Sequence, residues 1–221
     1  MYDATTLAIT GYRDEAVPHT FLRQDQAARH LAILLPGIAY TCDMPLLYYP
    51  WRLLLACGAD VLRVEYAYQQ RADFKVATAD EQGRWVVADV TAACHTVLAQ
   101  RDYEQVTFVA KSLGTLGLGP VLTADPRLTS AHVIWLTPLL RIDHVRADIA
   151  QWGGHSLFVI GTADPYYDAT YLAEVQHATR GETVVVDGAD HSLEIEGDVL
   201  RSLEAITQVM RAVQQFVPRA C

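Results

Sequence analysis

The chain has 221 residues, of which 51% are hydrophobic and 19% are charged. These proportions are typical of one globular domain with a sizeable core, so a single domain is expected over residues 1–221. The net charge of −9 and the lack of a Lys/Arg cluster argue against a nucleic-acid partner, and no apolar stretch is long enough to span a membrane.

Cysteine usage and the first residues favour a cytoplasmic protein. Cys42, Cys57, Cys94 and Cys221 show no close pairing, as expected of reduced thiols in the cytosol. The segment Met1–Thr6 has neither a basic region nor a long apolar run, so it does not predict a signal peptide. Neither CxxC nor His-x₃-His spacing occurs, so no metal site and no cofactor are expected.

Apolar runs and helical stripes alternate along the chain, which indicates strands separated by helices. Strands are expected at Thr5–Gly11, Val17–Gln24, His30–Leu35, Asp60–Tyr66, Gln105–Ala110, Ser130–Thr137, Ser156–Gly161 and Thr183–Asp187. Helices are expected at Leu46–Cys57, Asp80–Arg101, from Ser112 to Ala124, at Asp143–Trp152, at Asp168–Thr179, and over residues 199–217 with Asp198 as N-cap. The first two strands are expected to form a hairpin at the sheet edge, antiparallel to the rest.

The segment from Val106 to Gly119 has the pattern of a strand, a sharp turn and a helix, with a serine at the turn. A β-branched apolar run leads into Ala110, Lys111 and Ser112, and a helical segment rich in small residues follows. A serine hydroxyl is a weak nucleophile and needs a base beside it, and a sharp turn exposes the hydroxyl to such a base. The pattern predicts a nucleophile elbow with Ser112 as the nucleophile; an ordinary strand-to-helix turn is the alternative.

Two later strands end in the residues that a serine nucleophile requires. Asp164 follows the strand that ends at Gly161, and His191 follows the strand that ends at Asp187. Residues beyond the carboxyl ends of parallel strands meet at one edge of the sheet. The sequence therefore predicts a triad in which His191 is the general base for Ser112 and Asp164 orients the imidazole.

The choice of acid leaves an alternative open. Asp168 lies four residues after Asp164 and competes with it for this role, while Asp164 itself could be a turn or N-cap residue. Asp187 and Asp190 lie too close in sequence to His191 for the usual layout. We expect them to be solvated turn residues.

Four segments together resemble the α/β-hydrolase superfamily, and the resemblance covers nearly the whole chain. They are Leu35–Tyr40, Ala110–Gly114, Gly161–Pro165 and Gly188–His191. The order Ser, Asp, His along the chain is the one used in this superfamily. Ala110 departs from the glycine of the usual motif and adds a methyl group at a crowded contact. The resemblance implies an α/β-hydrolase fold of about eight mostly parallel strands with helices on both faces.

The resemblance also implies an oxyanion hole made of two backbone N–H groups. One belongs to Leu113, the residue after the nucleophile, and the other to Ile38 in the loop after the third strand. Gly37 would let this loop approach closely. Tyr40 lies near the predicted mouth of the site and is a candidate substrate-binding residue.

Two polar residues near the predicted mouth are given structural roles. Asp43 is expected to cap the helix that follows it. Lys111 is expected to point away from the pocket, with a structural or solvated role.

The connection Pro138–His155, between the sixth and seventh strands, has only 18 residues. Many relatives carry a lid or cap domain near this place, and here there is no room for a full one. We expect a small hydrolase without a lid, similar to the dienelactone-hydrolase-like group and small carboxylesterases. Its open site is expected to be walled by Ala67–Ala79 and Tyr40–Pro50.

The sequence thus predicts a serine hydrolase that cleaves small acyl esters through an acyl-enzyme. Its expected partner is a small-molecule acyl substrate, with no cofactor and no nucleic-acid or membrane partner. Thioesterase, lactonase and peptidase activities stay open because the same three residues serve all of them. The alternative from another class is a non-catalytic binding protein on the same fold, which the complete set of Ser, Asp and His disfavours.

Overall fold

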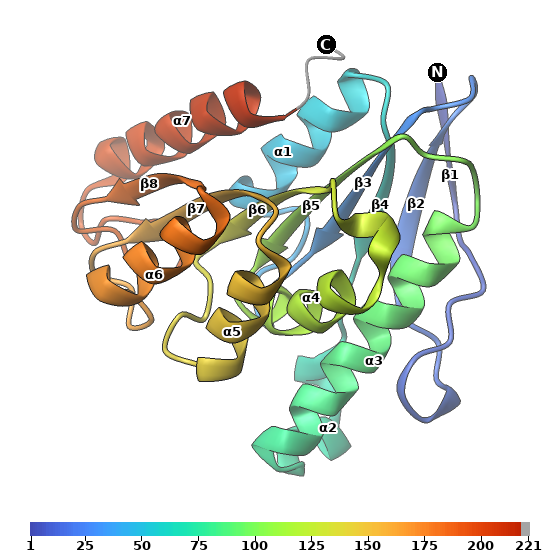
Figure 1. The fold of residues 1–221 in the computed structure, drawn as a ribbon, viewed down its shortest axis with the longest axis horizontal. Helices are drawn as coiled ribbons and strands as arrows, with labels where there is room; N and C mark the ends of the chain where they lie inside the picture. Colours follow the sequence, from blue (N-terminus) through green and yellow to red (C-terminus); the bar gives the residue numbers. More distant parts are fainter. Residues whose placement is uncertain (218–221) are drawn as a thin grey trace.

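The computed structural model describes residues 1–217, and its centre is one eight-stranded sheet with the order β1-β2-β4-β3-β5-β6-β7-β8 (Figure 1). The strands are β1 (Tyr2–Thr5), β2 (His19–Gln24), β3 (His30–Leu35), β4 (Asp60–Val64), β5 (Gln105–Lys111), β6 (His132–Leu136), β7 (His155–Gly161) and β8 (Glu182–Val186). The helices are α1 (Pro45–Ala56), α2 (Ala72–Val76), α3 (Ala79–Leu98), α4 (Leu113–Ala124), α5 (Asp143–Trp152), α6 (Ala169–Thr179) and α7 (Val199–Phe216).

Parallel pairing joins six strands, which lie in the order β4, β3, β5, β6, β7 and β8. Strand β2 is antiparallel to both of its neighbours, β1 and β4. β1 therefore runs in the same direction as the six parallel strands, and β2 alone opposes them. The prediction that the first two strands both oppose the rest was wrong for β1. The edge hairpin itself is present.

The strand predicted at Thr5–Gly11 was also wrong in its bounds, because β1 ends where that prediction begins. Beyond β1 the chain leaves the sheet and packs towards α3. Ile9 is buried there, and the backbone N–H of Tyr12 donates to the Asp89 carboxylate of α3 at 2.8 Å. The apolar residues of this segment fill the space between sheet and helix, which a strand pattern alone does not reveal.

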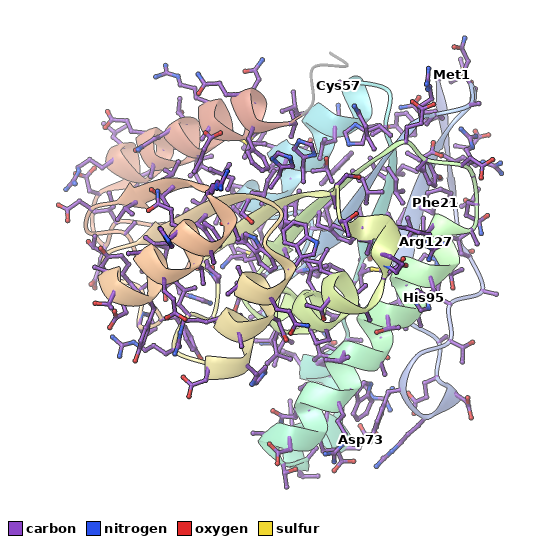
Figure 2. All side chains as sticks on the ribbon, viewed as in Figure 1. Met1, Phe21, Cys57, Asp73, His95 and Arg127 are labelled. Carbon is purple, nitrogen blue, oxygen red and sulfur yellow. The ribbon has the colours of Figure 1, made fainter. Side chains whose placement is uncertain are left out.

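Helices cover both faces of the sheet, with α1 and α7 on one face and α3 to α6 on the other (Figure 1). This double cover buries all six residues of β3, as expected of a parallel strand with a helix layer on each side. Side chains fill the space between the layers, and the labelled Phe21 of β2 is completely buried (Figure 2). Because β3, β5, β7 and β8 are parallel, their carboxyl ends lie at the same edge of the sheet.

The segment 67–79, predicted to be irregular and to wall the site, contains a 3-10 turn at Tyr68–Gln70 and the helix α2. Tyr68 stacks on Phe74 with ring centroids 4.3 Å apart, and its hydroxyl donates to Asp89 at 2.7 Å. Both rings also pack against Trp85 of α3. The segment is thus folded onto α3 by its aromatic residues.

Within residues 1–217, no helix is long and apolar enough to cross a membrane. Cys42 and Cys94 are buried free thiols, in line with the expectation of reduced cysteines. Cys57 departs from that expectation because it is disulfide-bonded. Cys221 lies outside the described residues.

Candidate active site

Ser112 stands at the sharp turn between β5 and α4. Its backbone has φ 49° and ψ −112°, a conformation that non-glycine residues adopt only where the surroundings hold them in it. A Cβ atom at Gly114 would lie 2.2 Å from the Leu35 carbonyl oxygen. Only glycine therefore allows α4 to pass so close to β3. The buried methyl group of Ala110 is accommodated beside this turn.

His191 bridges Ser112 and Asp164. Its Nδ1 lies 2.8 Å from Asp164 Oδ2, and its Nε2 lies 2.8 Å from Ser112 Oγ. An ionised carboxylate can only accept hydrogen bonds, so Nδ1 carries the proton and donates to Asp164. Nε2 is then the free acceptor for the Ser112 hydroxyl. This tautomer is the one in which the histidine can remove the serine proton.

The side chain of Asp164 is fully buried, whereas that of His191 is 31% exposed. The second carboxylate oxygen, Oδ1, accepts the backbone N–H of Tyr166 at 2.8 Å. A buried carboxylate is stable only when such donors replace its lost hydration. The Tyr166 ring lies 5.5 Å from the imidazole and tilts over it. The acid is therefore fixed in place, and the histidine keeps one side open to solvent.

The competing acid, Asp168, has a different position. Its Oδ1 accepts the backbone N–H groups of Thr170 at 2.9 Å and Tyr171 at 3.2 Å, which makes it the N-cap of α6. The structure thus brings Asp164, and not Asp168, to His191. Asp190 accepts N–H groups within its own turn, as expected of a turn residue.

The two predicted oxyanion donors lie in segments that meet at the serine: Leu113 follows Ser112 directly, and Ile38 follows Gly37, which packs on the elbow. Within residues 1–217, neither the Leu113 N–H nor the Ile38 N–H has a hydrogen-bond acceptor. Leu113 begins α4, where first-turn N–H groups lack partners and the helix dipole favours negative charge. A Cβ atom on Gly37 would lie 3.4 Å from the Ser112 Cβ, so the loop that carries Ile38 packs directly on the elbow.

Tyr40 is buried, and its hydroxyl accepts the backbone N–H of Leu46 at 3.0 Å. Burial raises the pKa of this tyrosine to about 12, so the hydroxyl is neutral at physiological pH. Tyr40 also carries the Lys111 ammonium over its ring, 4.5 Å from the centroid. Tyr40 thus lies beside the three predicted catalytic residues, and its hydroxyl already accepts a hydrogen bond from within the protein.

Lys111 was expected to be structural or solvated, and it is buried with 1% of its surface exposed. Its ammonium donates to Thr137 Oγ1 at 2.8 Å and to the backbone carbonyl of His191 at 2.7 Å. Sequence reasoning missed this contact. The available signal was a lysine between a buried apolar strand and the elbow serine, in a chain whose other lysine is Lys75.

The expected capping role of Asp43 was wrong. The N-cap position of α1 is Met44, without a side-chain cap, because Pro45 at the first helical position already removes one unpaired N–H. Asp43 instead accepts from the Arg63 guanidinium at 2.7 Å. This pair ties the loop after β3 to β4.

A cavity of about 810 Å³ lies beside the triad, between the start of α1 and the start of α7. Asp190 and Ser192, the two neighbours of His191 in sequence, line it together with Tyr40, whereas Ser112 and His191 do not. Its apolar lining includes Pro45, Ile195, Val199, Leu203 and Ile206, and its acidic lining is Asp190, Glu194, Glu196 and Asp198. No residue of 67–79 contributes, so only the Tyr40–Pro50 loop forms one of the expected walls.

No family model matches the sequence, and no curated protein matches it. Solved structures do match, over nearly the full length of both chains. An esterase from Pyrococcus furiosus has a TM-score of 0.70 at 13% identity, with 96% of this chain and 91% of that chain covered. A serine hydrolase without a lid from Xanthomonas campestris has a TM-score of 0.64 at 16% identity, covering 98% and 96%.

A dienelactone hydrolase from Anabaena variabilis has a TM-score of 0.69 at 14% identity, with 97% of this chain and 96% of that chain covered. At these identities the likeness establishes the fold. The chain has the α/β-hydrolase fold without a lid, as the short connection between β6 and β7 predicted.

Proposed function

We propose that this protein is a serine hydrolase that cleaves small acyl esters through a covalent acyl-enzyme. The observation that carries the proposal is the continuous chain of contacts from Ser112 Oγ through His191 to the buried Asp164, each of 2.8 Å. Among residues 1–217 the N–H groups of Leu113 and Ile38 have no hydrogen-bond acceptor, so both are available as the oxyanion donors that acyl transfer needs.

The mechanism begins with attack of Ser112 Oγ on the substrate carbonyl carbon, while its proton passes to His191 Nε2. The resulting imidazolium is stabilised by the Asp164 carboxylate. The negative oxygen of the tetrahedral intermediate accepts hydrogen bonds from Leu113 and Ile38 N–H. Removing one such donor typically costs about 10²–10³ in rate.

Collapse of the intermediate breaks the ester bond, and His191 Nε2 returns the proton to the leaving alcohol. The acyl group is now bound to Ser112. A water molecule then attacks this acyl-enzyme, with His191 again taking the proton, and release of the acid restores the free serine. Every proton transferred in this cycle passes through Nε2.

The cavity beside the triad supports a substrate that is partly apolar and not anionic. Its apolar lining suits an acyl or alkyl chain, whereas Asp190, Glu194 and Glu196 give its rim negative charge. We expect neutral esters to be hydrolysed about 3–10 times faster, in kcat/KM, than esters of equal length with a terminal carboxylate, which corresponds to roughly 1 kcal/mol of repulsion in water. Added salt should narrow the difference because it screens these charges.

A matched series of neutral and carboxylate-terminated esters, assayed at low and high ionic strength, measures this preference. Equal or faster hydrolysis of the anionic esters would refute the assignment of this cavity as the substrate-binding site. A lack of hydrolysis across ester, thioester and lactone substrates by the folded protein would count against the enzyme and favour the binding-protein alternative.

The pH dependence follows from the role of His191 as base. Only the neutral imidazole accepts the serine proton, so protonation of His191 at acid pH removes the base. We therefore expect kcat/KM to increase between pH 5 and 8 and to follow one apparent ionisation. A flat profile over this interval would remove His191 from the role of base.

A small-molecule acyl partner and a cytosolic location belong to the same proposal. The two buried free thiols, Cys42 and Cys94, are compatible with a reducing compartment. The disulfide at Cys57 argues against a reducing compartment. Fractionation of the source cells with an antibody to the protein tests the location; recovery outside the cytosolic fraction would refute it.

A further inference from the structure

Lys111 is the last residue of β5 and directly precedes Ser112. Its ammonium is held by three groups from three different parts of the chain. Thr137 lies at the end of β6, His191 lies in the loop after β8, and Tyr40 lies in the loop after β3. One side chain thus links the elbow strand to the loop that carries the histidine.

The backbone at Thr137 shows that this arrangement is held against strain. Thr137 is fully buried and has φ 43°, a conformation that is an outlier for a β-branched residue. Its N–H donates to the Val159 carbonyl at 2.7 Å, while its hydroxyl accepts from Lys111. Strain of this kind persists where the surroundings fix it and clusters at functional sites.

We propose that Lys111 is a positioning residue for His191: its ammonium, anchored on Thr137, holds the backbone carbonyl of His191 and so keeps the imidazole between Ser112 and Asp164. This inference rests on the proposed function, because it concerns the base of the same reaction. The contact is made to the main chain of His191, so it fixes the loop without competing for either ring nitrogen.

Charge gives the same residue a second effect. Within the described residues, no carboxylate lies within 4.0 Å of the Lys111 ammonium, so no ion pair neutralises it. Burial lowers the pKa of Lys111 to about 8, and the nearby Asp164 and Asp190 carboxylates oppose that shift. The lysine is therefore mostly charged at neutral pH. Its positive charge interacts with the nearby Asp164 and Asp190 carboxylates.

The identity of the side chain fits this role. Of the 17 Lys and Arg residues in the chain only Lys75 and Lys111 are lysines, so arginine is the usual cation here. A compact ammonium directs its donors to separate acceptors at the end of a thin flexible stem, whereas a guanidinium is a wide planar fork. The buried site between Thr137, Tyr40 and the His191 carbonyl suits the ammonium.

The test compares Lys111→Met, which keeps the length and apolar stem of the side chain, with Lys75→Met on the exposed face of α2. Lys111→Met should lower kcat by about 10–100-fold with KM little changed, because small displacements of a catalytic group cost rates of this order. The acid limb of its pH profile should also move to higher pH, since loss of a nearby cation makes His191 easier to protonate. Lys75→Met should behave as wild type.

An unchanged kcat and an unchanged acid limb in folded Lys111→Met would overturn the inference. A role confined to folding would lower the melting temperature without moving the acid limb, and this result would overturn it as well. Should Lys111→Met fail to fold, Thr137→Val supplies the second variant, because it removes the hydroxyl acceptor and keeps the β-branched shape. It keeps the ammonium but removes its anchor, so it should lower kcat with KM little changed.

A measurement on the unaltered protein completes the test. With only two lysines, ¹³C-lysine labelling gives two side-chain resonances, and Lys75 serves as the internal reference. Phosphonylation of Ser112 should shift the Lys111 resonance and leave that of Lys75 in place; two unchanged resonances would overturn the inference. If wild-type protein neither hydrolyses esters nor reacts at Ser112, the proposed function fails. If wild type is active and Lys111→Met matches it, the positioning role alone fails.

Discussion

Ser112→Ala and His191→Ala are each expected to lower kcat by about 10⁵–10⁶-fold, and the double variant is expected to be little worse than either. In the proposed mechanism the two residues act in one proton transfer across a 2.8 Å contact, so loss of either partner abolishes the step. Steady-state and single-turnover kinetics on the best ester measure both losses.

Matched controls are available on the surface. Ser130 and His144 are both exposed, and Ser130→Ala and His144→Ala should leave kcat unchanged. Losses that add in the double variant Ser112→Ala/His191→Ala, rather than saturate, would show that the two residues do not form one catalytic unit. Residual hydrolysis in the double variant should come from the oxyanion donors and substrate binding alone.

Asp164→Asn is expected to lower kcat by about 10⁴-fold although it changes the shape of the side chain little. The carboxylate selects the tautomer with the proton on Nδ1, because it can only accept. An asparagine amide can instead donate to Nδ1, which moves the proton to Nε2 and removes the acceptor for the Ser112 hydroxyl. The loss should appear in kcat, with the fold intact by circular dichroism.

Asp168→Asn is the matched control for the acid. Asp168 caps α6, and asparagine is also a good N-cap, so kcat and the melting temperature should both change little. Asp168→Ala should lower the free energy of unfolding by about 1 kcal/mol through loss of the cap, with kcat still near wild type. A larger loss of kcat in Asp168→Asn than in Asp164→Asn would transfer the role of acid to Asp168.

The parallel core of the fold could be predicted because its signals are local. β3 is an apolar run after His30, and β5 contains the β-branched apolar run that leads to Ala110. The final helix α7 has both a regular apolar stripe and the Asp198 cap, which the structure shows accepting the Arg201 N–H. The short connection after β6 also predicted the lack of a lid. Each of these features depends on residues adjacent in sequence.

The errors arose where distant residues decide the conformation. The segment after β1 leaves the sheet because Asp89 on α3 accepts the Tyr12 N–H. Asp43 does not cap α1 because it accepts a hydrogen bond from the Arg63 guanidinium instead. Neither partner is close in sequence. Burial and pairing across the fold override the local pattern in both cases.

The candidate site shows the same division. Ser112, Asp164 and His191 could be selected in advance because each follows a strand and their chain order is informative. The contact of Lys111 with the His191 carbonyl joins residues 80 positions apart. Nothing in the local sequence specifies which carbonyl a buried lysine reaches.

The most direct test of the central claim is fluorophosphonate labelling of the intact protein, mapped by mass spectrometry and repeated on Ser112→Ala. An activated serine beside a neutral histidine attacks phosphorus, so we expect one adduct, located on Ser112 and absent from the variant. Lack of labelling of the folded wild-type protein, or labelling that persists in Ser112→Ala, would contradict the assignment of Ser112 as a catalytic nucleophile.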